Sequence, residues 1–146
     1  MTHPNFETFR TYLEESDPEA QWEPTPVQLA SPPFWLELGT HLLHYIDRRI
    51  EDPEPFEWYG HFLDKSIEAL AYAHQLTQQA TDIDPVMPQI VAISLGFAYF
   101  LRGHSSLIEG AYDAAFLDFD AAVTYNPDPQ YQQLRAKALA QLNTQA

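Results

Sequence analysis

The stretch "AYDAAFLDFDAAVTYNP", residues 111–127, decides the fold. In it Ala115 is followed after three residues by Phe119, after two more by Ala122, and after four more by Pro127. Intervals of three and four residues return to one side of an α-helix, so two small alanines and a large ring share that side. Proline then ends the helix, because it lacks the backbone N–H and clashes with the preceding turn. The stretch predicts a helix that packs closely against another one.

A second half-pattern, "AISLGFAY", precedes this stretch, and both halves have a counterpart in the first part of the chain. Each counterpart lacks one aromatic residue: Leu42 takes the place that Tyr99 has, and Thr77 takes the place that Phe119 has. Glycine in one helix and alanines in the next let two helices approach, while large residues fill the gaps between them. The residues are Ala92, Leu95, Gly96 and Tyr99 ahead of the stretch, and Trp35, Leu38, Gly39 and Leu42 with Ala73, Thr77, Ala80 and Pro85 earlier in the chain.

The ordered pair of half-patterns resembles the tetratricopeptide repeat, whose units contain W-x2-L-G-x2-Y, then A-x3-F, then P. The resemblance covers roughly residues 33–127 and implies about two divergent units. The two terminating prolines lie 42 residues apart, and the two Leu-Gly pairs lie 57 apart, whereas the standard period is ~34. The residues it assigns to repeat packing are Trp35, Leu38, Gly39, Ala73, Ala80, Leu95, Gly96, Tyr99, Ala115, Phe119, Ala122 and Pro127.

The fold class expected from the whole chain is all-α, because no segment alternates polar and apolar residues as a half-buried strand does. We expect a compact, tetratricopeptide-like bundle of antiparallel hairpins with about five to six helices in a single domain. Residues 1–32 are expected to form a short helix and a proline-rich linker packed on the core, and residues 33–146 the helical domain. The expected helices cover residues 5–15, 34–50, 56–81, 88–102, 106–125 and 129–142.

The expected helix of residues 88–102 is apolar almost all round, and such a helix is normally buried. Two covers are possible for it: residues 1–32 folding back over it, or a partner molecule. We favour the first, because this segment has spare aromatic side chains. The apolar residues are Ile90, Val91, Ile93, Leu95, Phe97, Tyr99, Phe100 and Leu101.

The balance of charge limits the classes of partner. Seven basic residues against 21 acidic ones give a net charge of −14. Nucleic acids and anionic membrane surfaces need clustered cations, so neither is expected as a partner. A basic protein surface would suit the acids, although they could equally serve only solubility. Without cysteine, a leader-like amino terminus or an apolar run of spanning length, we expect a cytoplasmic protein that does not insert into membranes.

No catalytic constellation stands out, so we expect a protein that is not an enzyme and holds no cofactor. His41 and His44 follow Glu37 on one helical face, but neither His-Glu-x-x-His nor Glu-x-x-His occurs, and we expect no metal site. His104 lies next to Ser105 in the sequence, too close for a working nucleophile and base, and helix capping is the simpler role for that serine.

The expected function is therefore a non-catalytic protein–protein interaction module, such as an adaptor, assembly factor or regulatory subunit with an acidic surface. The alternative is an acidic inhibitor that mimics DNA and blocks a basic cleft, although its acids should then form long regular rows. The sequence leaves the oligomeric state open. The candidate partner-binding residues are Trp58, Tyr59, Phe62, Glu109, Asp113 and Asp120.

Overall fold

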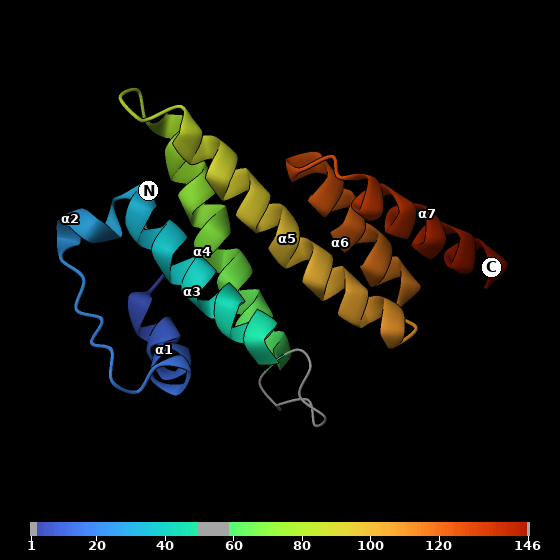
Figure 1. Ribbon diagram of the computed structural model, residues 1–146, viewed down its shortest axis with the longest axis horizontal. Coiled ribbons are helices and arrows are strands. Elements are labelled where there is room, and N and C mark those ends of the chain that lie inside the picture. Colours follow the sequence, from blue (N-terminus) through green and yellow to red (C-terminus); the bar gives the residue numbers. More distant parts are fainter. Residues whose placement is uncertain (1–2, 50–58, 146) are drawn as a thin grey trace. The chain divides into compact units, whose positions relative to one another are not determined.

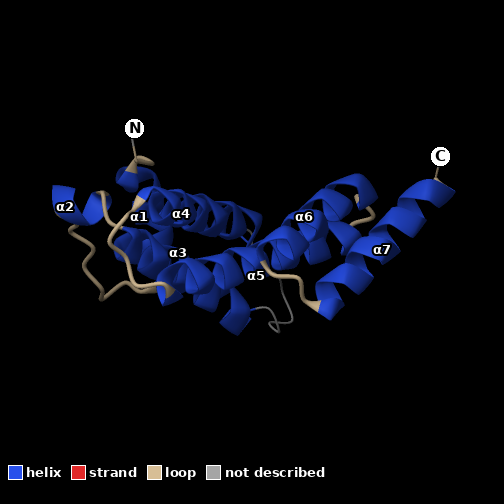
Figure 2. Ribbon diagram, turned by 90° about the horizontal axis from the view of Figure 1, so that it is seen from above, coloured by secondary structure: helices blue, strands red, loops and turns tan. Residues whose placement is uncertain are grey.

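The computed structural model describes residues 3–49 and 59–145. The all-α class is confirmed: within these residues the chain forms seven α-helices and one 3₁₀ helix, and no strand (Figure 1, Figure 2). The 3₁₀ helix η1 covers Phe6–Phe9. The α-helices are α1 (Arg10–Ser16), α2 (Pro26–Leu29), α3 (Pro32–Arg49), α4 (Tyr59–Gln79), α5 (Val86–Ile108), α6 (Tyr112–Tyr125) and α7 (Pro129–Thr144).

The structure has one more α-helix than the five to six that we expected. The additional one is α2, which lies inside the proline-rich linker. Its first turn is closed by a capping box. The Thr25 side chain accepts from the Gln28 backbone N–H at 3.2 Å, and the Gln28 side chain accepts from the Thr25 N–H at 2.8 Å. Pro26 at the first helical position costs nothing, because its missing N–H would have had no partner in the helix.

Gly103 does not end a helix, as we expected it to. The chain stays helical through it to Ile108 and turns at Gly110, whose φ of 81° suits glycine. A Cβ on Gly103 would lie 2.9 Å from ring atoms of Phe119, so this glycine permits close packing. The following helix accordingly starts at Tyr112 rather than near residue 106.

The chain divides into two compact units, Met1–Val91 and Ala92–Ala146, which we describe one at a time. In the first, α3 and α4 pack side by side along their length (Figure 1). Their closest approach is at Gly39, where a Cβ would lie 2.6 Å from Cγ of the buried Leu70. The buried Ser66 hydroxyl donates to the Gly39 carbonyl oxygen at 2.9 Å.

Residues 3–31, the amino-terminal segment, pack on this helix pair. Phe9 lies edge-on to Trp35 with ring centroids 5.6 Å apart, and Tyr12 lies edge-on to Phe62 at 5.0 Å. The Trp35 Nε1–H donates to the Leu29 carbonyl oxygen at 2.8 Å. These aromatic side chains find partners on α3 and α4 within the first unit, and the coverage of the apolar helix of residues 88–102 by this segment stays a prediction.

In the second unit α5 packs on α6, and α6 packs on α7. A Cβ on Gly96 would lie 3.3 Å from the Ala122 carbonyl oxygen, which places this glycine at a close helix–helix contact. The Tyr99 and Tyr125 rings stack 5.9 Å apart and only 3° from parallel. The small-and-large stripe of α6 is buried as its spacing indicates, and a cluster of Ala115, Phe119 and Ala138 forms the core.

Most residues assigned to repeat packing are buried, with exceptions at the two helix ends. Ala80 is exposed, one residue beyond the end of α4, so it packs no helix pair. Pro127 is exposed too and follows the carboxyl-terminal cap of α6. Tyr99 is half-buried. The buried ones are Trp35, Leu38, Gly39, Ala73, Leu95, Gly96, Ala115, Phe119 and Ala122.

Candidate functional site

One side of α5 carries large apolar side chains that are exposed. Val86, Ile90 and Ile93 follow one another at intervals of four and three residues and are 52%, 43% and 55% exposed. Phe97 continues the same row four residues later and is half-buried. We call these four residues the α5 face. The opposite side of the helix is core, with Val91, Leu95 and Ala98 fully buried.

The two ends of α5 carry acidic groups. The Asp84 side chain accepts from the Val86 backbone N–H at 2.9 Å and so caps the start of α5. Asp82 lies just before it, and Glu109 lies in the turn after the helix, beyond Arg102; both acids are exposed. From Val86 to Leu101 the helix has no charged residue. The site is therefore an apolar row that begins beside acidic groups, on a helix with a further acid after its far end.

Among the described residues, α5 is also the one helix long and apolar enough to cross a membrane, judged by length and composition only. Its most apolar window has a mean hydropathy of 1.3 and is 33% buried. We expected no run of that length, because we ended the helix at Gly103. A core helix of a water-soluble protein meets the same criterion, and Arg102 of α5 is ion-paired to Asp118 of α6.

The three acids predicted to bind a partner, Glu109, Asp113 and Asp120, fall within the expected helix of residues 106–125 but do not all lie on one helix in the structure. Glu109 lies in the turn before α6 rather than on it. Asp113 is in the first turn of α6, where its carboxylate accepts from the Ala114 backbone N–H at 2.8 Å. Asp120 forms an ion pair with Arg135 of α7 at 2.9 Å. All three are exposed, but two of them are already engaged within the protein.

The three aromatic residues predicted to bind a partner differ in their exposure. Trp58 lies outside the described residues. Tyr59 is half-buried, and burial followed by the nearby Asp47 carboxylate raises the pKa of its phenol. Phe62 is fully buried beneath Tyr12, so its ring is part of the core and offers no surface to a partner.

His41, weighed as a metal ligand, instead holds the amino-terminal segment. Its Nε2 lies 2.9 Å from the Ser16 hydroxyl, and its ring lies edge-on to Trp22 at 5.4 Å. Burial, followed by the opposing Asp17 carboxylate and then the nearby Arg48 and His44, leaves the pKa of this imidazole lowered. Among residues 3–49 and 59–145, no three His, Asp or Glu side chains gather as metal ligands.

The ion pair between Arg102 and Asp118 was not predicted from the sequence. Asp118 lies among the apolar positions of α6 and is almost completely buried, and Arg102 interrupts an otherwise apolar helix. Opposite charges at apolar positions of two neighbouring helices are the signal that such a pair leaves in a sequence, because an unpaired buried charge is costly. Here both partners also flank the stacked tyrosines, with the guanidinium 5.4 Å above the Tyr99 ring.

Most acidic side chains in the described part of the chain are exposed. Ion pairs within that part join several of them to basic side chains. The pairs are Arg10 with Glu7 and Glu23, Lys65 with Glu68, Arg102 with Asp118, and Arg135 with Asp120.

No protein-family model, curated protein or solved structure matches the chain. The resemblance to tetratricopeptide repeats therefore stays a prediction, drawn from the spacing of residues. The function must be argued from the α5 face and its surroundings.

Proposed function

We propose that the protein is a non-catalytic interaction module whose α5 face binds an amphipathic helix of a partner protein, with basic residues beside its apolar side. In this role it acts as an adaptor, assembly factor or regulatory subunit of the cytoplasm and needs no cofactor. The observation that carries the proposal is the exposure of Val86, Ile90 and Ile93 in one row on α5.

Exposed side chains of this kind are unevenly distributed. Of the seven large hydrophobic residues that are exposed in the described part of the chain, four belong to α5, Ile108 being the fourth. Single exposed hydrophobic residues are ordinary, whereas a contiguous row marks a surface for binding. Burying the exposed half of an isoleucine contributes roughly 1 kcal/mol at ~25 cal/mol per Å², so a row of three can support specific binding.

The shape and charge of the face favour a helical, basic occupant. Residues spaced by three and four along a straight helix present a narrow row, which a second helix with the same spacing can pack against. The acids at the two ends of α5 would attract Lys or Arg of such a helix. A second copy of this chain fits less well, because two molecules of net charge −14 repel each other.

The alternative, an inhibitor that mimics DNA, has less support. A mimic needs acids held out in regular rows to stand in for phosphates. Asp113 instead accepts a hydrogen bond from its own helix, and Asp120 is neutralised by Arg135.

The proposal can be tested with a synthetic helix of about 21 residues that carries Leu at i, i+3, i+4 and i+7 and Lys elsewhere. We expect micromolar binding, measured by fluorescence anisotropy of a labelled peptide. Ile90→Gln with Ile93→Gln should weaken it at least tenfold, since the variant removes the centre of the face. Leu117→Gln, which alters an exposed apolar residue of α6, is the control and should bind as the unaltered protein does.

Two results would overturn the proposal. Equal binding by the double variant and the unaltered protein would show that the peptide binds only the general acidity of the surface. A dimer in sedimentation that the double variant dissociates would identify a second copy as the occupant of the α5 face.

A further inference from the structure

The amino-terminal segment is fastened to α3 at one titratable group. The end of α1 approaches α3 at Ser16, whose hydroxyl oxygen lies 2.9 Å from His41 Nε2, and the linker returns to the same imidazole at Trp22. Both ends of the loop that joins α1 to the linker therefore meet at the His41 ring. Loss of this contact would free the loop from α3.

We propose that residues 3–31 form a cover on α3 that is sensitive to pH, with neutral His41 holding it closed and protonated His41 loosening it. The apolar surface beneath the cover includes Phe34 and Trp35, which the segment contacts through Phe6, Phe9 and Trp22. Mild acid would thus expose an aromatic surface of α3 that is closed at neutral pH.

The hydrogen bond itself survives protonation, so the effect arises from charge. The Ser16 hydroxyl also lies 3.0 Å from the Leu13 carbonyl oxygen, to which its single proton can be donated. Nε2 then donates to the Ser16 oxygen in both the neutral and the charged imidazole. What protonation adds is a positive charge on a half-buried ring, and burial penalises the charged form.

The charged groups around the His41 ring have opposing effects on its pKa. Asp17, from the turn after α1, and Glu37 of α3 favour the charged imidazole, while His44 and Arg48 of α3 disfavour it. Asp47 of α3 lines the same open groove beside Ser16 and His41. With burial the largest cause, the pKa of His41 lies below its ordinary value of 6.5 while the cover is closed.

The lowered pKa of His41 determines the direction in which pH changes the closure of the segment. A free segment exposes His41 and returns its pKa to the ordinary value, so the open form binds the proton more readily. Closure is therefore favoured fully above pH 6.5 and progressively less as pH falls through the lowered pKa of the closed form.

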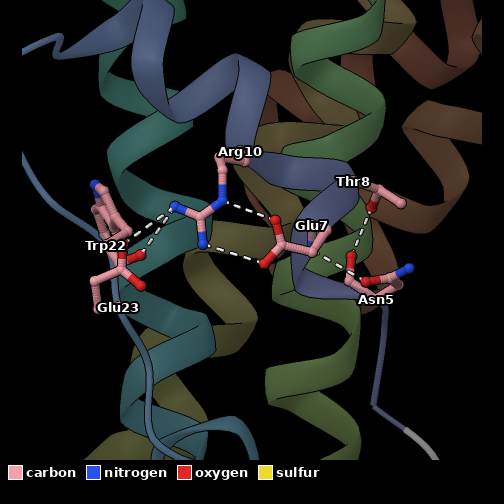
Figure 3. Close-up of polar contacts among 6 residues, drawn as sticks. All are labelled: Asn5, Glu7, Thr8, Arg10, Trp22 and Glu23. Atoms are coloured by element: carbon pink, nitrogen blue, oxygen red, sulfur yellow. Dashed lines mark hydrogen bonds and ion pairs between the residues drawn. The ribbon is translucent and has the colours of Figure 1, made fainter.

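A second observation indicates that the cover is loosely fastened near His41. The indole Nε1–H of Trp22 is buried and has no hydrogen-bond partner. A buried donor without an acceptor gains a partner when water reaches it, which favours opening. The other polar contacts of this loop are few and partly exposed: Arg10 donates to the Trp22 carbonyl oxygen at 3.3 Å and lies 3.5 Å from Glu23 (Figure 3).

The test is amide hydrogen exchange of the full chain at about pH 7.5 and about pH 5.5, expressed as protection factors so that the intrinsic pH dependence cancels. We expect residues 10–31 to lose protection severalfold at the lower pH, while α6 and α7 change little. His41→Gln keeps an amide donor at the position of Nε2 and cannot titrate. In this variant the loss of protection at the lower pH, the pH step, should vanish. His44→Gln and His3→Gln remove neighbouring histidines and should leave the step in place.

Ser16→Ala removes the hydrogen bond to His41 but leaves the group that titrates. It should therefore lower protection at both pH values and keep the difference between them. The proposal is overturned if His41→Gln shows the same step as the unaltered protein, or if the unaltered segment shows no step beyond that of α6 and α7.

Discussion

Arg102 of α5 and Asp118 of α6 form a two-point ion pair, with Nη2 2.8 Å from Oδ1 and Nε 3.0 Å from Oδ2. The Asp118 side chain is only 10% exposed, whereas the guanidinium is 36% exposed. The buried negative charge of Asp118 is thus balanced by Arg102, whereas the Arg102 side chain still contacts water. Such a geometry fixes the register of the two helices.

Removing the arginine should cost more than removing an exposed partner elsewhere in the same unit. We expect Arg102→Met to lower the free energy of unfolding by about 1–3 kcal/mol, below the ~3–5 kcal/mol of fully buried pairs. Arg135→Met, at the more exposed pair with Asp120, is the matched control and should cost less than about 1 kcal/mol. Urea unfolding followed by circular dichroism measures both. Equal losses would mean that Asp118 is better hydrated than its burial indicates.

The two helical glycines of the first unit should respond in opposite directions to alanine. Gly39→Ala places a Cβ 2.6 Å from Leu70 Cγ and 3.3 Å from the Leu70 backbone nitrogen, and Leu70 has no free space to move into. We expect a loss of about 1–3 kcal/mol from overpacking. At Gly60 a Cβ would meet nothing within 4 Å, so Gly60→Ala should raise the stability of α4 by up to about 1 kcal/mol. Thermal unfolding of the two variants gives the comparison, and a neutral Gly39→Ala would contradict the close approach of α3 and α4.

Two residues on opposite sides of α5 provide a test of exposure. Ile93→Ala should change the free energy of unfolding by less than about 0.5 kcal/mol, because its side chain is 55% exposed. Leu95→Ala, two residues later and fully buried, should cost about 2–5 kcal/mol. Denaturant titration of both decides the question. A large loss for Ile93→Ala would mean that this side of α5 is covered in solution.

The spacing of small and large residues predicted the helices and their close contacts well, because it reflects local geometry. Gly39, Gly96 and the stripe of Ala115, Phe119 and Ala122 lie at helix contacts, as their periodicity indicated. Gly103 was misjudged because glycine serves two purposes, ending helices and permitting close approach, and only the packing partner distinguishes them.

The candidate site was predicted less well than the fold, because exposure depends on long-range contacts. Periodicity identified Ile90 and Ile93 as apolar but could not say what lies over them. Phe62 belongs to an aromatic run after several prolines that we interpreted as surface, yet Tyr12, fifty residues earlier in the chain, covers it. A pattern reveals which side of a helix is apolar and not which segment meets it.

The final prediction concerns how charge contributes to the binding of the Leu and Lys helix by the α5 face. Exposed charges are screened beyond about 10 Å at ~0.1 M salt, so the association rate should fall as salt rises, while the dissociation rate changes little. Asp82→Asn with Glu109→Gln removes exposed acids just beyond the two ends of α5 and should slow association without altering the fold. Asp113→Asn, which affects an acid away from the row, serves as the control and should have a smaller effect. Stopped-flow fluorescence separates the two rates. If association ignores both the salt and the double variant, the acids at the ends of α5 do not steer the partner, and the net charge of −14 serves solubility alone.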